Sequence, residues 1–394
     1  MRIGIITLWQ SSDNYGQQLQ CWALQQQLLK MGHEPYLIRY DIEHRFHYKS
    51  PLWKKIIKLM LLYPVFKRLK NRKRNKEEKE LIAYNASKNL SRDFVNFRKD
   101  NLFMSEKLYS SLQELKDNPP EADAYIVGSD QVWAHLLSVN ENRAMYLDFG
   151  DDRVKRIAYA PSFSMPKYPE DIKVCLKKNL GRFDSLSVRE QTGVGICREL
   201  GYDAKVVVDP TMLLDRSDYS KIKTSVSKGK FIYLYYLNIS APEEVEWKQL
   251  KSFAQEQNLK VVATPATGYI SGRELFDDVD YIYATIPQWI DMIDQAQLVV
   301  TTSFHGVVFC ILHHTPFVYF PLYGKYSRGN NRVLDLCNML HLNDRIWKGD
   351  RVFSFYYLNP INWEEVDRLL NKQRGHSIEY LKCLTDGKEK STLH

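Results

Sequence analysis

The chain of 394 residues is predicted to form two Rossmann-like, doubly wound α/β domains that face each other across a cleft. Three observations support this fold class. The chain is longer than most domains that are built on a single hydrophobic core. Short apolar runs alternate with segments of helical periodicity. This alternation occurs in two series, which are separated by a polar stretch at residues 215–230.

The first domain is expected over residues 1–218 and opens with a strand–helix–strand unit. The strand "RIGIITL" precedes a helical run that ends at "KMGHEP", where glycine and then proline stop a helix, and "YLIRYD" is the next strand. Later strands are expected at "ADAYIVG", "RIAYA", "SLSV" and "AKVVV". A basic, helix-prone insertion over about residues 44–118 interrupts the pattern.

The second domain is expected over residues 219–355 and repeats the alternation. Its strands begin with "FIYLYYLN" and "LKVVATPA", and the stretch 281–325 follows the order helix, strand, turn, helix, strand. Residues 356–394 are expected to be helices that close the structure. Two such domains make a GT-B-like arrangement, in which ligands bind at the carboxyl ends of the strands.

Cysteine usage and hydropathy indicate the compartment. The six cysteines include no pair at CxxC spacing, which suggests buried thiols rather than disulfides or a metal site. The short apolar run at the N-terminus does not resemble a signal peptide, and no stretch has the ~18 apolar residues needed to span a bilayer. We therefore expect a cytoplasmic protein.

The basic character of the chain is local. Ten Lys and Arg residues and no acidic residue lie between Trp53 and Lys76, interleaved with apolar side chains. A basic amphipathic segment of this type favours contact with an anionic membrane surface over contact with nucleic acid. Alternatively, it is a helical insertion that packs on the domain. The residues expected at the membrane are Trp53, Lys54, Lys58, Lys67 and Arg68.

Polar residues follow two strands of the first domain. The loop "SSDNYGQQLQ" places Asn14, Tyr15 and Gln18 at the start of a helix, where backbone amides are available to a ligand. "VGSDQVW" places Ser129 and Asp130 just beyond a buried strand, where a carboxylate can bind hydroxyls or accept a proton. The alternative for both loops is that their polar side chains only cap helices.

Two further strand ends carry candidate residues. Arg189 in "SVRE" suits a phosphate or carboxylate, although an ion pair with Glu190 or Asp209 is the alternative. In "VVTTSFHG", His305 begins a helix, whose dipole favours a neutral ring that can act as a base. The alternative is a hydrogen-bonded histidine in the turn.

Glycine and hydroxyl residues surround that histidine, and three cations follow it. Ser303 offers a hydroxyl, and Gly306 allows a ligand or another backbone to approach. Lys325, Arg328 and Arg332 lie within eight residues of one another beside a flexible turn. This loop is suited to a small, highly charged anion, or else it is a solvated basic loop.

Several of these motifs, in this order, resemble the polysaccharide pyruvyl transferase family. The matching pieces include "NYGQQLQCWALQQQLLKMGHE", "ADAYIVGSDQVW", "RIAYAPSF", "SVREQTGV", "VVVDPTMLL" and "AQLVVTTSFHGVVFCILHHTPFV". The resemblance implies a GT-B-like fold and transfer of the pyruvyl group of phosphoenolpyruvate to two sugar hydroxyls. The product would be a cyclic ketal on a cell-surface polysaccharide precursor, often lipid-linked, with release of phosphate.

The resemblance carries over to individual positions unevenly. His305 and Arg189 match functional residues of the family, but Ser303 stands where many members have arginine. Lys325, Arg328 or Arg332 would then replace that cation.

From these observations we expect three groups of site residues and no cofactor besides phosphoenolpyruvate as co-substrate. Proton transfer is assigned to His305 and Asp130. The donor would be bound by Arg189, Ser303, Gly306, Lys325, Arg328 and Arg332, and the acceptor by Asn14, Tyr15, Gln18 and Ser129. No metal site is expected. The alternatives are a nucleotide-sugar glycosyltransferase on the same fold and a non-catalytic, membrane-associated scaffold.

Overall fold

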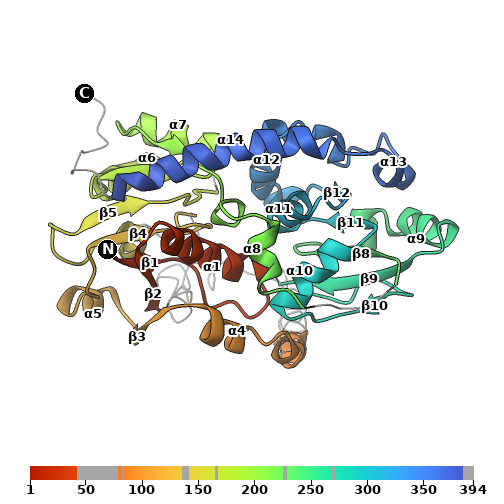
Figure 1. Ribbon diagram of the computed structural model, residues 1–394, viewed down its shortest axis with the longest axis horizontal. Helices are drawn as coiled ribbons and strands as arrows, with labels where there is room; N and C mark the ends of the chain where they lie inside the picture. Colours follow the sequence, from red (N-terminus) through yellow and green to blue (C-terminus); the bar gives the residue numbers. More distant parts are fainter. Residues whose placement is uncertain are drawn as a thin grey trace, which may run out of the picture.

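Two parallel sheets, one in each half of the molecule, form the framework of the protein (Figure 1). The computed structural model describes residues 1–41, 79–81, 83–134, 142–164, 167–224, 229–267 and 272–384. The predicted membrane-contact residues Trp53, Lys54, Lys58, Lys67 and Arg68 lie outside the described residues. The two sheets confirm the predicted fold class of two Rossmann-like α/β domains.

The first sheet has seven strands in the order β3-β2-β1-β4-β5-β6-β7, all parallel. Its strands are β1 (Arg2–Ile6), β2 (Glu34–Tyr40), β3 (Met104–Tyr109), β4 (Ala124–Val127), β5 (Lys155–Ala158), β6 (Ser185–Val188) and β7 (Lys205–Val206). The central strands are almost continuously buried, as in sheets covered by helices on both faces. The strand order reverses between β1 and β4.

The predicted insertion at 44–118 contributes more than helices. Within its described part, α4 (Phe94–Asn101) and α5 (Leu112–Asp117) flank β3, which pairs with β2 at the edge of the sheet. The strand "MSEKLY" is largely exposed and carries Glu106 and Lys107. Charged residues are typical of edge strands, because they discourage pairing with other chains, and they hide the strand from a search for apolar runs.

The second sheet has five parallel strands in the order β10-β9-β8-β11-β12. They are β8 (Phe231–Tyr236), β9 (Lys260–Pro265), β10 (Asp280–Tyr281), β11 (Leu298–Thr301) and β12 (Phe317–Tyr319). The order again reverses in the middle, between β8 and β11. Each domain therefore has one reversal point, and the loops there are the natural place for a ligand.

Helices cover both sheets (Figure 1). The remaining α-helices are α1 (Tyr15–Lys30), α6 (Glu170–Leu180), α7 (Gln191–Glu199), α8 (Arg216–Ser220), α9 (Trp247–Glu256), α10 (Ile286–Gln295), α11 (Phe304–His313), α12 (Asn331–Met339), α13 (Phe353–Leu358) and α14 (Trp363–Leu381). Three short 3-10 helices near the cleft are η2 (Leu90–Arg92), η4 (Pro210–Met212) and η6 (Gly324–Asn330).

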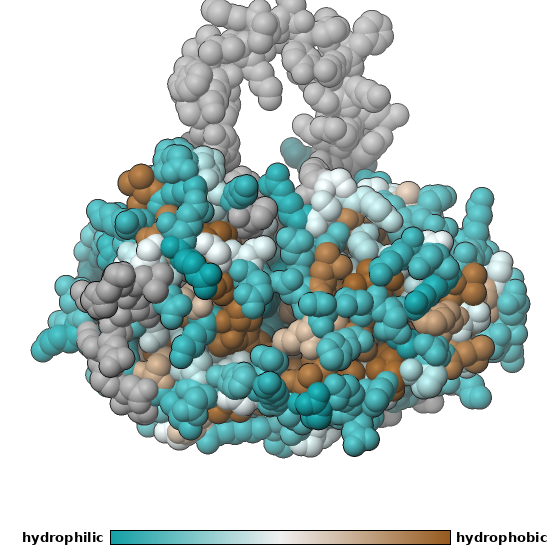
Figure 2. Space-filling model, turned by 90° about the horizontal axis from the view of Figure 1, so that it is seen from above, coloured by the Kyte–Doolittle hydropathy of each residue, from teal (hydrophilic) through white to brown (hydrophobic). Residues whose placement is uncertain are grey.

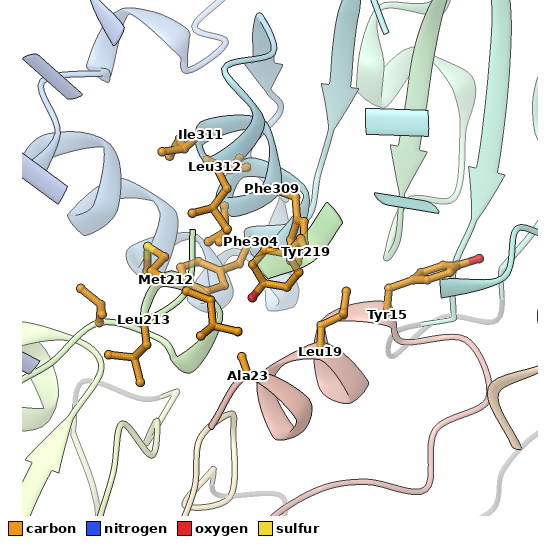
Figure 3. Packing of buried hydrophobic residues seen from close by; sticks show 14 of the residues in the cluster. Tyr15, Leu19, Ala23, Met212, Leu213, Tyr219, Phe304, Phe309, Ile311 and Leu312 are labelled. Atoms are coloured by element: carbon orange, nitrogen blue, oxygen red, sulfur yellow. The ribbon is translucent and has the colours of Figure 1, made fainter. Parts of the chain in front are cut away.

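One hydrophobic core joins the two domains. Figure 3 shows side chains of α1 in the first domain facing side chains of α11 in the second, with η4 and α8 beside them. Tyr219 of α8 contacts Phe309 of α11 edge to face, with ring centroids 4.9 Å apart. Because this interface is apolar and continuous, it fixes the N-terminus of α11 against the N-terminus of α1.

The last helix returns to the first domain. Figure 1 shows α14 running from the second half back over the first. The Val208 amide donates to Ser377 Oγ at 3.0 Å, and the Tyr380 hydroxyl donates to the Ala158 carbonyl at 2.9 Å.

Among the described residues, no helix is long and apolar enough to cross a membrane. Figure 2 shows a largely hydrophilic face with scattered apolar patches over both halves.

Candidate active site

A cavity of about 580 Å³ lies between the domains, at the carboxyl ends of strands from both sheets. Its walls come from the loops after β1, β4 and β11 and from the end of β8 and the loop that follows it. These are the strands at which each sheet reverses its order, so the cavity is the candidate active site. Predicted site residues that line it are Asn14, Asp130, Ser303, His305, Arg328 and Arg332.

His305 lies in the first turn of α11, on the second-domain wall of the cavity. Ser303 is the N-cap of this helix, and its hydroxyl accepts from the Gly306 amide at 3.2 Å. The Gly306 amide is therefore used within the helix and is not offered to a ligand. Among the described residues, the Phe304 and His305 amides have no such acceptor, so they remain as donors at the positive end of the helix.

A buried carboxylate from the first domain faces this histidine. Asp209 Oδ2 lies 3.6 Å from His305 Nε2. The Thr211 amide and hydroxyl donate to Asp209 Oδ1 at 3.1 and 2.7 Å, and Ser129 Oγ lies 3.2 Å from Oδ2. The carboxylate is thus held in one orientation, with one oxygen directed at the imidazole.

Charges around Asp209 keep it ionised. Burial by itself raises the pKa of this carboxyl, but His305, Arg189 and the Thr211 hydroxyl outweigh burial and lower the pKa well below its usual range. Burial likewise acts to lower the pKa of Arg189, and Asp209, Asp130 and Glu190 reverse that effect and raise it. Asp209 and Arg189 are therefore both charged in the folded protein.

Arg189 is part of this ion network and does not line the large cavity. Its Nη1 donates to Asp209 Oδ2 at 2.7 Å, and its Nη2 lies 3.5 Å from Asp130 Oδ1. Its Nε lies 3.9 Å from Glu190 Oε2. The ion pair with Asp209, weighed as the alternative role for this arginine, is present. Arg189 instead borders a smaller cavity of about 250 Å³.

An aromatic ring separates the two cavities. Phe304 borders both, with the Arg189 guanidinium 4.9 Å from its ring centroid and the Arg332 guanidinium 5.7 Å from it. Arg332 also borders both cavities, and Arg328 borders the large one. Lys325 belongs to η6 beside them, and its side chain lies outside the described part of the structure.

The predicted acceptor residues divide between cavity and core. Asn14 lines the cavity and caps α1, accepting from the Gln17 amide at 3.1 Å. Tyr15 is fully buried and stacks on Trp289, and Gln18 is buried and donates to the Trp9 carbonyl at 2.7 Å. Ser129 is buried beside Asp209. Tyr15, Gln18 and Ser129 thus support the site from behind and do not face the cavity.

Gly16 brings α1 into contact with the histidine. A Cβ atom at this position would lie 1.9 Å from His305 Nδ1, so only glycine lets the ring rest against the helix. Gly306 has a comparable structural role, because a Cβ there would lie 2.4 Å from Thr301 Oγ1. Gly306 therefore allows close packing of α11 on β11 rather than approach of a ligand.

Further contacts hold the cleft closed on one side. Asp13 Oδ2 accepts from the Thr267 amide at 2.8 Å, which links the loop after β1 to the loop after β9. Arg92, from η2, is buried and donates to the Tyr15 hydroxyl and to the Pro265 carbonyl. These bonds span both domains, so the described structure is a docked arrangement.

Sequence reasoning missed two contributors to the site. Asp209 appeared only as a possible ion-pair partner, and Gly16 was not singled out. The signal for Asp209 was its place after the strand "AKVVV", the same strand-end position that identified Asp130 and Arg189. Within the described residues, no group of three or more His, Cys, Asp or Glu side chains is arranged to hold a metal ion.

Solved structures that resemble this one include a UDP-GlcNAc 2-epimerase from Methanocaldococcus jannaschii and the calicheamicin glycosyltransferase. The epimerase is 10% identical, with 98% of this chain and 100% of that chain covered and a TM-score of 0.46. The glycosyltransferase is 12% identical, with 98% and 96% covered and a TM-score of 0.46. A comparison with curated proteins finds no match.

The family comparison covers most of the chain. The family model described as polysaccharide pyruvyl transferase matches residues 14–322. That range begins at the cap of α1 and includes Asp209, His305 and the whole second sheet. The chain therefore belongs to the polysaccharide pyruvyl transferase family.

Proposed function

We propose that this protein transfers the pyruvyl group of phosphoenolpyruvate to two hydroxyls of a sugar, forming a cyclic ketal and releasing phosphate. Membership of the family supports the reaction class. The observation that carries the proposal is the presence of His305, Arg328 and Arg332 in the wall of one interdomain cavity. This combination supplies both cations for an anionic donor and a group for proton transfer.

The donor needs several positive partners, because it carries a carboxylate and a phosphate. Arg328 and Arg332 are proposed to bind these groups, since guanidinium forks match both anions. The Phe304 and His305 amides add two donors at the positive end of α11. Arg332 and Arg328 thereby take the place of the arginine that many relatives have at the position of Ser303, with Lys325 as a third candidate. Arg189 acts indirectly, by stabilising Asp209.

The reaction requires two additions to the same carbon. One sugar hydroxyl adds to C2 of the enol and loses its proton to a base, while C3 gains a proton and becomes a methyl group. The second hydroxyl then attacks C2, the C2–O bond to phosphate breaks, and the proton of that hydroxyl leaves with the phosphate as the ketal closes. We assign proton transfer to His305 and orientation of the acceptor hydroxyl to Asp130, with Asn14 beside it. The docked domains limit access of water to the activated donor.

The acceptor is proposed to be a precursor of a cell-surface polysaccharide, lipid-linked and presented at the inner face of the membrane. The basic segment around Trp53 and Lys67 would hold a cytoplasmic protein at that anionic surface. In this proposal neither nucleic acid nor any cofactor or metal takes part, and phosphoenolpyruvate is a co-substrate.

The test is incubation of the purified protein with phosphoenolpyruvate and a panel of free and lipid-linked sugars. We expect acceptor-dependent phosphate release and a mass gain of one pyruvyl ketal on the acceptor. His305→Asn is the negative control. If nucleotide sugars and not phosphoenolpyruvate raise the melting temperature, the alternative of a nucleotide-sugar glycosyltransferase replaces the proposal. If neither class binds, the scaffold alternative gains.

A further inference from the structure

We infer that Asp209, in the first domain, is the positioning residue for His305, in the second, so that the proton-transfer group is complete only when the domains are docked. The inference deepens the proposed function and rests on it. It assigns a role to a buried carboxylate that does not line the large cavity and so does not touch a ligand there.

The first step is the rigidity of the carboxylate. Asp209 has no exposed surface. Thr211 donates twice to Oδ1, while Ser129 Oγ and Arg189 Nη1 contact Oδ2. A carboxylate held by four groups cannot rotate away from the imidazole. Such a fixed partner is how buried carboxylates orient catalytic histidines on unrelated folds.

The second step is the state of the imidazole. His305 Nε2 is buried and, within the described residues, has no hydrogen-bond partner; Asp209 Oδ2, 3.6 Å away, is the carboxylate oxygen that it faces. The Nδ1 edge of the ring rests on Gly16, at the N-terminus of α1. A negative charge beside Nε2 favours the tautomer with the proton on Nε2. Nδ1 then keeps its lone pair.

The third step is the origin of the partners. His305 belongs to α11 of the second domain, whereas Asp209 and Gly16 both belong to the first. The other charged groups of this cluster, Arg189, Asp130 and Glu190, also belong to the first domain. Arg328 and Arg332, which share the cavity wall with the histidine, belong to the second domain. Separation of the domains would therefore remove the carboxylate that faces the histidine, together with the groups that hold it.

The kinetic test compares Asp209→Asn with the wild type. The isosteric amide removes the charge, so we expect kcat to fall by about 10²-fold or more, the scale of a lost acid–base group, with little change in the KM for phosphoenolpyruvate. Thr211→Val keeps the charge and loosens its anchoring, so its kcat should lie between the two. Unchanged kcat in folded Asp209→Asn, or an equal loss in donor affinity, overturns the inference.

A second test does not depend on activity. In protein labelled with ¹⁵N-histidine, the His305 signals are assigned from their loss in His305→Asn. In the wild type we expect Nε2 to carry the proton of the neutral ring. In Asp209→Asn we expect the population of the Nδ1-protonated tautomer to increase. The same tautomer in both proteins overturns the inference. A wild type without pyruvyl transfer but with the expected tautomer change would refute the proposed function alone.

Discussion

At the scale of single residues, Gly16 is the position where the first domain touches the candidate catalytic ring. It adds no functional group, yet the space it leaves open is filled by His305. Any side chain there must displace either the imidazole or the start of α1. The site therefore depends on an absent Cβ as much as on the groups that are present.

Gly16→Ala tests this dependence. We expect turnover to fall by about 10² or more, because a displaced His305 no longer transfers protons effectively. Gly195→Ala is the matched control, since a Cβ at Gly195 meets no atom within 4 Å. Steady-state kinetics and melting curves of both variants provide the comparison, and a fully active Gly16→Ala would argue against His305 as the acid–base group.

The two arginines of the cavity wall should act on donor binding. Removal of either Arg328 or Arg332 by substitution with alanine is expected to raise the KM for phosphoenolpyruvate by about tenfold or more, the usual worth of a charge-assisted hydrogen bond. Arg351→Ala serves as control, because Arg351 stacks on Phe355 outside the cavity. A donor KM that is unchanged in both variants would remove these arginines from the donor site.

The sequence alone could not show which residues at the start of α1 line the cavity and which face the core. Asn14 and Gln17 line the cavity, whereas Tyr15 and Gln18 face the core. Neighbouring positions on a helix point about 100° apart, so a loop-to-helix junction selected as a block includes both faces. Arg189 shows the same limit, because a strand-end position does not reveal which buried acid a guanidinium will meet.

At the scale of elements, Tyr15 joins α1 to both the 83–101 segment and the second domain. Its hydroxyl accepts from Arg92 Nη1 and donates to the Ala284 carbonyl at 2.7 Å. Burial raises the pKa of Tyr15 to about 12, although Arg92 opposes this, so the hydroxyl keeps its proton near neutral pH. The role expected from the sequence was acceptor binding, and the geometry instead gives a structural one.

Tyr15→Phe separates these roles. We expect unfolding to become easier by about 1–3 kcal/mol, because Arg92 and the Ala284 carbonyl lose a buried partner, while the KM for the acceptor changes little. Tyr84→Phe is the control, since Tyr84 is 44% exposed and its hydroxyl donates a long hydrogen bond of 3.4 Å to Glu274. A raised acceptor KM without loss of stability would restore the acceptor-binding role.

At the scale of the whole molecule, an ion cluster ties the connection between the domains to the second domain. Asp294 of α10 forms ion pairs with Arg216 and Lys223, which belong to the stretch that connects the domains. Asp294 also contacts Nδ1 of His313, at the end of α11. His313 is buried. Burial lowers its pKa and outweighs the opposing effect of Asp294, while Arg216 and Lys223 lower it further.

This cluster makes stability depend on pH. In the unfolded chain a histidine has a pKa near 6.5, whereas in the folded protein the pKa of His313 is lower. Below pH 6.5 the unfolded chain therefore binds more protons than the folded protein. The contribution of His313 to the free energy of unfolding is thus present above pH 6.5 and is lost as the pH falls below it. We expect the free energy of unfolding in urea to decrease from pH 7.5 to pH 5.5. This decrease should be smaller in His313→Gln than in a control with a substitution at the exposed His376. An equal dependence of stability on pH in the two variants would contradict the role given to His313.

The fold class could be predicted, because buried parallel strands appear in the sequence as continuous apolar runs that end in polar turns. The docking of the domains could not, since it depends on long-range contacts such as Asp209 with His305 and Asp13 with Thr267. The edge strand β3 was hidden by its own charges. These are features set by neighbours in space, which a single sequence does not display.

The return of α14 also sets an order for synthesis. Residues 219–355 of the second domain are translated before Ser377 and Tyr380, yet Val208 and Ala158 of the first domain form hydrogen bonds with those two side chains. The half of the protein that is translated first is therefore the half that is completed last. A chain that stops short of Ser377 would contain all of residues 219–355, while its first domain would lack the end of the helix that closes it.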